Sequence, residues 1–147
     1  MAKDGEQEIS VFRPAKPGLR KILGDLEADI METVWQAGPQ AKVTVRDVHD
    51  HRQSMRKAAY TTVMTVMGIL AKKGILVVEK DSFAHRYMAR QTKEEFTKAA
   101  VGNILDELLS DFAEPALAHF SETFEPQETQ KLELLKEMIA QRRKKED

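Results

Sequence analysis

The sequence predicts a mainly α-helical protein with one small β-hairpin. Apolar residues recur at the spacing of an α-helix along most of the chain from residue 22 onward. Two short runs rich in β-branched and aromatic residues, 75–80 and 84–88, are separated by only three residues and predict the hairpin. Charge then divides the chain: residues 11–92 hold 14 Lys and Arg against 8 Asp and Glu, whereas residues 93–147 hold 8 against 13. We therefore expect a basic part that binds a polyanion and a second part with another task, unless the difference is a chance fluctuation on two solvated surfaces.

Composition limits the class of protein. With 147 residues, of which 41% are apolar and 32% charged, the chain has room for one ordinary domain or for a small domain with a dimerising segment. No apolar run is long enough to span a membrane, and the first ten residues carry net negative charge where a signal peptide is basic, so we expect a cytoplasmic protein. The absence of cysteine excludes disulfides, thiolate metal ligands and a cysteine nucleophile.

The first 21 residues predict a flexible basic arm, because they combine prolines and glycines with no sustained apolar period. Apolar residues then recur at helical spacing from Leu26 to Trp35, which predicts the first helix. Asp25 is the candidate cap at its start, and Gly38-Pro39 ends it. The basic residues of the arm are Arg13, Lys16, Arg20 and Lys21.

Two more helices follow. Thr44 and Asp47 have the spacing of a capping box, with Asp in place of the usual Glu, and predict a short helix over 45–52. After a polar turn, a third helix is predicted over 59–73 and ends at Gly74. One apolar stripe of this helix has the spacing needed to pack on the first two helices: Val63, Val66, Met67 and Leu70.

The exposed start of the third helix holds three threonines, and no acidic residue occurs before Gly74. Threonine is a mediocre helix former, so three of them are unusual on a merely solvated face. Their hydroxyls can bond phosphates or base edges, and the methyl groups of Thr and Met can touch thymine methyls in the major groove. The helix is therefore predicted to bind DNA, the alternative being an idle threonine-rich helix start. The candidate contacts on this helix and just before it are Arg46, Tyr60, Thr61, Thr62, Met64, Thr65 and Lys72.

Three helices followed by a hairpin are the order of a winged helix-turn-helix domain, here predicted over 22–91. Lys80, His85 and Arg86 would lie on the hairpin, or wing, where they can reach the sugar-phosphate backbone next to the groove that the third helix enters. A winged helix can also serve as a protein-binding module, because a fold does not fix a function. The scarcity of acidic residues on the third helix and the wing favours DNA.

Residues 92–147 predict a helical dimerisation domain. Thr92 and Glu95 form a capping-box pattern before a helix that reaches about residue 110, and Pro115 and Pro126 begin two further helical segments. Helices this short cannot bury such apolar faces alone, so we expect a second copy to cover them, the alternative being a monomer in which they fold back on the DNA-binding domain. The candidate dimer contacts are Phe96, Leu105, Leu108, Leu109, Phe112, Leu117, Phe120, Leu132, Leu135 and Ile139.

Several segments resemble one known family: LGDLEADIMETVW, VTVRDVHD, AYTTVMTVMGILAKKGIL, EKDSFAHRYMA and PALAHF. They are similar to the penicillinase and methicillin-resistance repressors of the BlaI/MecI/CopY type, from Leu23 to the last helix. The resemblance implies a dimeric repressor on an inverted repeat over a promoter, with the helix that starts near Thr61 as its recognition helix. For many members it also implies induction by proteolysis, in which a membrane-embedded metalloprotease sensor responds to a cell-wall antibiotic and the repressor is cut in its dimerisation segment.

The resemblance carries over to individual positions. The threonines at the front of the recognition helix, its basic end and the return strand of the wing match at Thr62, Thr65, Lys72, Lys73, Arg86 and Tyr87. Two departures remove expected phosphate contacts, because Ile69 stands where members usually have arginine and Ser82-Phe83 stand where the wing tip is often basic or contains glycine. We therefore expect weaker binding or a larger share of it from the basic arm.

The family resemblance also implies which peptide bond is cut on induction. In the staphylococcal members the cut falls before a phenylalanine preceded by asparagine, and the matching pair here is His119-Phe120, so the usual residue before the cut is missing. The copper-responsive branch binds its metal through a C-terminal cysteine cluster. This chain has no cysteine, which excludes copper sensing through thiolates.

No residue pattern predicts catalysis or a cofactor. His49 and His51 are two positions apart on a helix, so their side chains diverge and cannot share one metal ion. His85 and His119 stand alone in the sequence, and the chain has no phosphate-binding glycine loop, zinc-type spacing or serine elbow. We expect a protein that is not an enzyme and whose partners are operator DNA, a second copy of itself and, by the family resemblance, a membrane-bound sensor protease.

Overall fold

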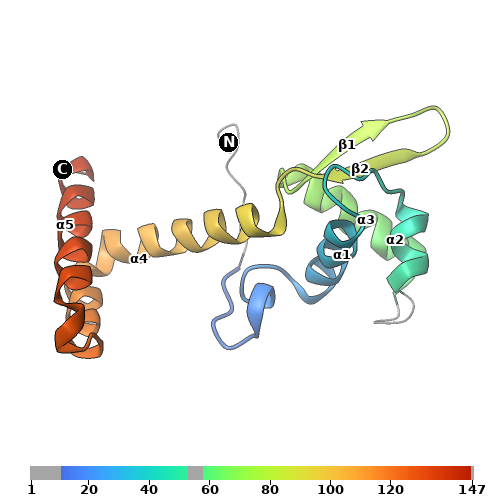
Figure 1. Ribbon diagram of the computed structural model, residues 1–147. Coiled ribbons are helices and arrows are strands. Elements are labelled where there is room, and N and C mark those ends of the chain that lie inside the picture. Colours follow the sequence, from blue (N-terminus) through green and yellow to red (C-terminus); the bar gives the residue numbers. More distant parts are fainter. Residues whose placement is uncertain (1–10, 53–57, 147) are drawn as a thin grey trace. The chain divides into compact units, whose positions relative to one another are not determined.

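The computed structural model describes residues 11–52 and 58–146 and divides the chain into two compact units, one up to Ala100 and one from Val101 onward. Helices make up most of the described chain, and a two-stranded antiparallel hairpin lies in the first unit (Figure 1). The predicted fold class, mainly α with a small β-hairpin, is confirmed.

The first three α-helices lie close to their predicted limits. They are α1 (Asp25–Gln36), α2 (Val45–Arg52) and α3 (Tyr60–Lys72). The capping box of α2 is confirmed, since Thr44 N donates to Asp47 Oδ2 over 3.0 Å and Asp47 N donates to Thr44 Oγ1 over 3.1 Å. The predicted cap of α1 is wrong. Gly24 is the N-cap, its N–H donates to Glu27 Oε1 over 2.9 Å, and Asp25 becomes the first helical residue.

Apolar side chains from α1, α2, α3 and the hairpin form the core of the first unit. Val63, Met67 and Leu70 of α3 are each 0% exposed, as their spacing predicts, but Val66, the fourth residue of the predicted stripe, is only partly buried. The three helices lie together on one side of the hairpin (Figure 1). The other large side chains of this core with almost no exposed surface are Ile30, Met31, Val34, Val48, Leu76 and Phe96. Burial of one stripe fixes the rotation of α3, so its opposite face points outward.

The hairpin consists of β1 (Leu76–Lys80) and β2 (His85–Ala89). A third segment, not predicted from the sequence, pairs with this hairpin: Val43 and Tyr87 exchange two backbone hydrogen bonds of 2.9 and 2.7 Å. These two hydrogen bonds attach the segment between α1 and α2 to strand β2 of the wing. Burial, and secondarily the neighbouring Tyr60 phenol, raises the pKa of the Tyr87 hydroxyl above its ordinary value.

The last part of the predicted arm is not flexible. A short 3-10 helix, η1 (Gly18–Lys21), precedes α1, and Arg20 Nη2 lies 2.6 Å from Oδ1 of the nearly buried Asp29. Arg20 Nη1 also donates to Asp25 O over 2.9 Å. The hydrogen bond to Asp29 is the main cause that raises the pKa of the Arg20 guanidinium. This ion pair fastens the end of the arm to α1, so Arg20 is not a free DNA contact. Residues 1–10 lie outside the described residues.

Helix α4 (Lys93–Thr123) starts in the first unit and continues in the second. Its capping box is confirmed, since Thr92 N donates to Glu95 Oε1 over 3.3 Å and Glu95 N donates to Thr92 Oγ1 over 3.1 Å. The backbone leaves helical geometry at Phe112 (φ −130°, ψ 40°), near the predicted end of this segment. Pro115 explains the break, because its ring clashes with the carbonyl four residues earlier and it lacks an N–H.

The second unit contains the remainder of α4, a 3-10 turn η2 (Pro126–Glu128) and α5 (Thr129–Glu146). Among its described residues only Ala113 and Ile139 are buried, one from each of the two helices. No helix within the described ranges is long and apolar enough to cross a membrane.

Candidate nucleic-acid interface

The outward face of α3 is a row of small and basic residues. Thr61, Thr65, Gly68 and Lys72 lie opposite the buried stripe and are all exposed. Three further predicted contact residues are exposed on the flanks of the row: Tyr60, Thr62 and Met64. The row is thus free to meet a partner along its whole length.

The charge of this helix suits an anion. The first turn of α3 has no acidic residue, the last turn has Lys72, and among the described residues no side chain caps the helix start at Ala59. The first N–H groups of a helix have no partner within it and carry partial positive charge. A phosphate placed at the start of α3 would accept hydrogen bonds from these groups.

The hydroxyl of Thr65 has a defined direction. Thr65 Oγ1 donates to Thr61 O over 2.9 Å, one turn earlier in the helix. Because the proton is used within the helix, the lone pairs of Oγ1 remain available as acceptors. The amino groups of adenine and cytosine are the donors in the major groove. Thr65 is therefore suited to accept a hydrogen bond from a base edge, whereas donation to a phosphate would require its internal bond to break.

No contact within the described part of the protein requires a glycine at position 68. It lies in the interior of α3, and a Cβ atom added to it would meet nothing within 4 Å among the described atoms. Glycine in a helix interior costs about 1 kcal/mol relative to alanine. A glycine on an outward face allows another molecule to approach the helix backbone closely. The sequence places Gly68 on the surface of this helix, but it is not among the predicted DNA contacts, although a glycine in the middle of an apolar helix was the available signal.

Aromatic and cationic contacts position the start of α3. Arg46 Cζ of α2 lies 5.8 Å from the centre of the Tyr60 ring, and the His49 ring meets the same tyrosine edge-on at 5.8 Å. His49 Nε2 lies 3.1 Å from Ala58 O, which joins α2 to the residue before the N-cap of α3. The predicted contacts Arg46 and Tyr60 are thereby brought together at the amino end of α3.

The wing presents basic side chains at its tip. Lys80 and His85 form the last residue pair of the hairpin, and Arg86 follows on β2. The two carboxylates of the wing are each close to a cation, Glu79 Oε2 at 2.7 Å from Lys42 Nζ and Asp81 Oδ2 at 3.9 Å from Arg86 Nη2. All ten DNA-contact residues predicted from the sequence are exposed.

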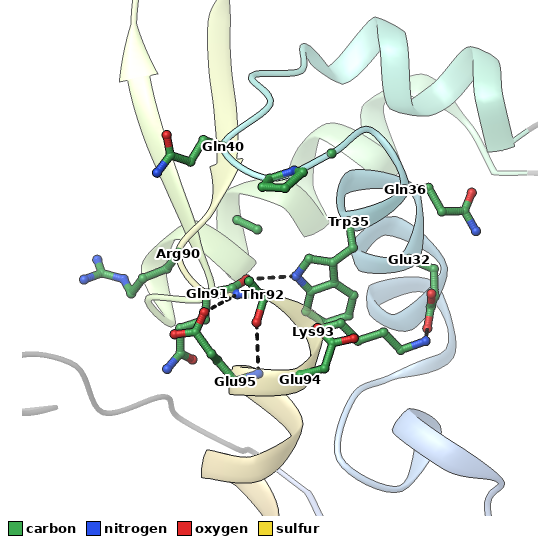
Figure 2. A pocket seen from close by; sticks show the side chains of 13 residues that line it. Glu32, Trp35, Gln36, Gln40, Arg90, Gln91, Thr92, Lys93, Glu94 and Glu95 are labelled. Atoms are coloured by element: carbon green, nitrogen blue, oxygen red, sulfur yellow. Dashed lines mark hydrogen bonds and ion pairs between the residues drawn. The ribbon is translucent and has the colours of Figure 1, made fainter.

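The first unit also contains a cavity of about 510 Å³ between α1, the end of β2 and the start of α4 (Figure 2). Polar groups on its wall pair with each other: Trp35 Nε1 donates to Gln91 O over 3.0 Å, and Lys93 Nζ lies 2.7 Å from Glu32 Oε1. Gln91 Oε1 is buried and has no hydrogen-bond partner among the residues that the structure describes. No residue of α3 or of the wing tip lines this cavity, and its paired groups hold the start of α4 on α1.

An apolar row follows α4 in the second unit. Val101, Leu105, Leu108 and Phe112 are 45 to 56% exposed and are spaced by four, three and four residues. This spacing places them on one side of the helix, as in the seam of a coiled coil. Leu134 and Met138 of α5 are exposed to a similar degree.

The predicted dimer contacts divide into two groups. Phe96 is 1% exposed and its ring centre lies 5.6 Å from that of Trp35, so this prediction is wrong: the ring completes the core of the first unit. Ile139 is also buried without a second chain. The other predicted contacts keep exposed surface to varying degrees: Leu105, Leu108, Leu109, Phe112, Leu117, Phe120, Leu132 and Leu135.

The predicted cleavage pair lies within α4, beyond the break at Phe112. His119 is exposed and Phe120 is half-buried, and the Phe120 ring lies 5.9 Å from that of Phe124. The backbone at this pair is helical, so a protease that binds extended chain would first have to unwind it.

A family model and two sequence relatives indicate one family. A family model described as "Penicillinase repressor" matches residues 23–141. Two relatives from Mycobacterium tuberculosis, strains CDC 1551 and H37Rv, are both described as "Transcriptional regulator BlaI". Each is 39% identical over 102 residues, which cover 68% of this chain and 72% of the relative. A solved structure titled "Solution structure of the DNA binding domain of the repressor BlaI" has 19% sequence identity and a TM-score of 0.43, covering 50% of this chain and 85% of its own.

The family model spans most of the chain, including both the helices of the first unit and most of the second. Its members are transcriptional repressors and not enzymes, and a winged helix that binds only proteins is not favoured. The chain belongs to the penicillinase repressor family of DNA-binding transcriptional repressors.

Proposed function

We propose that this repressor binds a palindromic operator in the cytoplasm as a homodimer, with one first unit on each half-site. The observation that carries the proposal is the outward row of α3, Thr61, Thr65, Gly68 and Lys72, which is exposed and lacks acidic residues. Small hydroxyl side chains and a glycine allow a helix to lie close to the base edges of the major groove.

Each first unit contacts its half-site through two kinds of residue. Thr62, Met64 and Thr65 contact base edges and provide sequence preference. The basic residues and the uncapped start of α3 contact phosphates and provide affinity that falls with salt. The phosphate-contacting set consists of Arg46, Lys72, Lys80, His85 and Arg86.

The apolar row Val101, Leu105, Leu108 and Phe112 supports a dimer. Leaving four large apolar side chains about half exposed on one helix side is unfavourable in water, and a second copy of the same row would cover them. Two linked first units bind two half-sites with an effective concentration that raises affinity by about 10² to 10⁴ over one.

The test starts from an operator selected out of a random duplex pool with the full-length protein. Fluorescence anisotropy then compares the selected palindrome, one isolated half-site and a random duplex at two salt concentrations. The proposal predicts tightest binding to the palindrome, weaker binding to the half-site and strongly salt-dependent binding to the random duplex. Equal affinity for all three duplexes would contradict it.

Release of the operator by a membrane-bound sensor protease is the last part of the proposal, and it rests on the family. The exposed His119 beside Phe120 supplies the matching pair, in a short helical segment after the break at Phe112. Mass spectrometry of the repressor from cells exposed to a cell-wall antibiotic should show fragments that end at His119. Intact protein in cells whose target genes are induced would refute this route.

A further inference from the structure

We propose that Phe83, at the tip of the wing, enters the minor groove of the operator beside the segment bound by α3. The inference deepens the proposed function and rests on it. Phe83 is 98% exposed, more than any other large apolar side chain in the described part of the chain. Single exposed apolar residues are common on protein surfaces, so exposure alone assigns no role. The position of the ring and the charges around it indicate its role.

The pairing of the two strands does not depend on the Phe83 ring. Lys80 and His85 are the last paired residues of the two strands, and Phe83 lies in the turn between them. Asp81 Oδ1 accepts a hydrogen bond from Ser82 N over 2.6 Å, so a polar contact of the preceding residues helps to form this turn. Removal of the ring should therefore leave strand pairing and stability unchanged.

Charge around the tip favours nucleic acid as the occupant. Three cations, Lys42, Lys80 and Arg86, lie on or beside the wing against two carboxylates, and both carboxylates have a cation within 4 Å. The apolar tip therefore lies beside charged groups whose net charge is +1, with Lys80 next to the turn. Cations next to an apolar side chain match the minor groove, where phosphates line both edges and the floor accepts apolar side chains.

The packing of the wing explains the choice of groove. β1 packs against α3, so when α3 lies in the major groove the wing extends over the adjoining phosphate backbone. The groove beyond that backbone is the minor groove. An aromatic ring makes no hydrogen bond to a phosphate, but apolar side chains do insert between base steps from the minor-groove side. Pyrimidine–purine steps unstack most easily, so the ring should prefer a TA or CA/TG step at a position that α3 does not touch.

The first experiment compares Phe83→Ala, Phe83→Leu and Lys80→Ala in operator titrations over a range of salt. Phe83→Ala should bind about 5- to 100-fold more weakly, the range seen when an aromatic contact to a base is removed. Its salt dependence should match the wild type, because an apolar contact releases no counterion. Leucine also acts as a wedge, so Phe83→Leu should retain most of the affinity. Lys80→Ala should reduce the salt slope by about one.

The second experiment locates the ring on the DNA. A 2-aminopurine placed at the flanking pyrimidine–purine step should brighten when wild-type protein binds, because the base is unstacked, and should not brighten with Phe83→Ala. Replacing that step by GC should weaken the wild type and leave Phe83→Ala unaffected. Thermal unfolding serves as the control and should give one midpoint for wild type and all three variants.

The outcomes separate the two proposals. A wild-type protein that does not prefer the operator to random duplex would refute operator binding itself. If the wild type prefers the operator and Phe83→Ala binds it equally well, only the wedge is overturned. A weaker Phe83→Ala whose salt slope also falls would assign the loss to phosphate contacts and would overturn the wedge as well.

Discussion

The two units of this repressor differ in where they place their apolar side chains. Of the 19 apolar residues that are buried in the described chain, 17 lie in the first unit and two in the second. The second unit instead exposes a row of large apolar residues along α4. The first unit therefore has a core of its own, whereas the described residues of the second unit bury only two apolar side chains, which is why we propose that a second copy covers its exposed row. DNA recognition and the proposed dimerisation can accordingly be disturbed one at a time.

The largest effect is expected at the apolar row. Leu108→Asp places a charge among Val101, Leu105 and Phe112, where burial without a partner is costly, and should give monomers. The first unit should still fold, but preference for the palindrome over the half-site should fall by about 10² to 10⁴. Asn103→Asp is the matched control, since it adds the same charge on the opposite side of α4. Sedimentation and titrations with full and half operators measure both results.

The next prediction separates folding from DNA binding on a single helix. Met67→Ala removes a side chain that is 0% exposed and should lower the free energy of unfolding by about 2 to 5 kcal/mol. Met64→Ala removes an exposed side chain of the same type three residues earlier, and should change stability little while weakening the operator complex. Thermal unfolding and anisotropy titration test the pair. Equal destabilisation by both changes would show that α3 is rotated differently from this structure.

Thr65→Ala should weaken operator binding by about 1 to 3 kcal/mol if Oγ1 accepts from a base, with little change for random duplex. Thr97→Ala is the control, because Thr97 Oγ1 makes the same type of bond, 2.7 Å to Lys93 O, on α4. Loss of affinity that is equal for operator and random duplex would move Thr65 into the phosphate-contacting set.

Gly68→Ala should have opposite effects on the stability of the protein and on its affinity for the operator. Alanine is the better helix former and finds open space here, so the free energy of unfolding should rise by up to about 1 kcal/mol. Operator affinity should fall, because the added methyl group separates α3 from the groove floor. A variant that is more stable and binds equally well would show that DNA does not approach this position.

The smallest effect concerns alkaline pH. Burial raises the pKa of Tyr87 in the folded state above its unfolded value of 10.0, so the neutral phenol is favoured by folding. That stabilisation is fully present below pH 10 and is lost as pH rises through the folded pKa. Wild type should therefore lose stability above that pH faster than Tyr87→Phe in denaturant titrations. Parallel curves would contradict the assignment.

Local patterns in the sequence predicted most of the first unit. Helix α2 and its capping box follow from residues three positions apart, and the outward row of α3 follows from helical periodicity. Contacts between distant residues could not be predicted in this way. The bridge between Val43 and Tyr87 and the ion pair between Arg20 and Asp29 depend on how segments meet in space.

The same limit explains the error at Phe96. Its spacing on α4 places it with the apolar residues of the dimer surface, and the periodicity of one helix does not show which neighbour covers which turn. The first two turns of α4 belong to the first unit, because Phe96 and Ala100 are buried there. The boundary between the units therefore follows Ala100 and not residue 91, where sequence composition changes.

In the proposed dimer, two first units with complete cores are joined through their second units. Sedimentation equilibrium of the full-length protein at micromolar concentration, without and with one equivalent of palindromic duplex per two chains, tests it most directly. We expect twice the mass of the 16.7 kDa chain without DNA, and two chains on one duplex with it. A monomer without DNA, or one chain on a saturated palindrome, would contradict it.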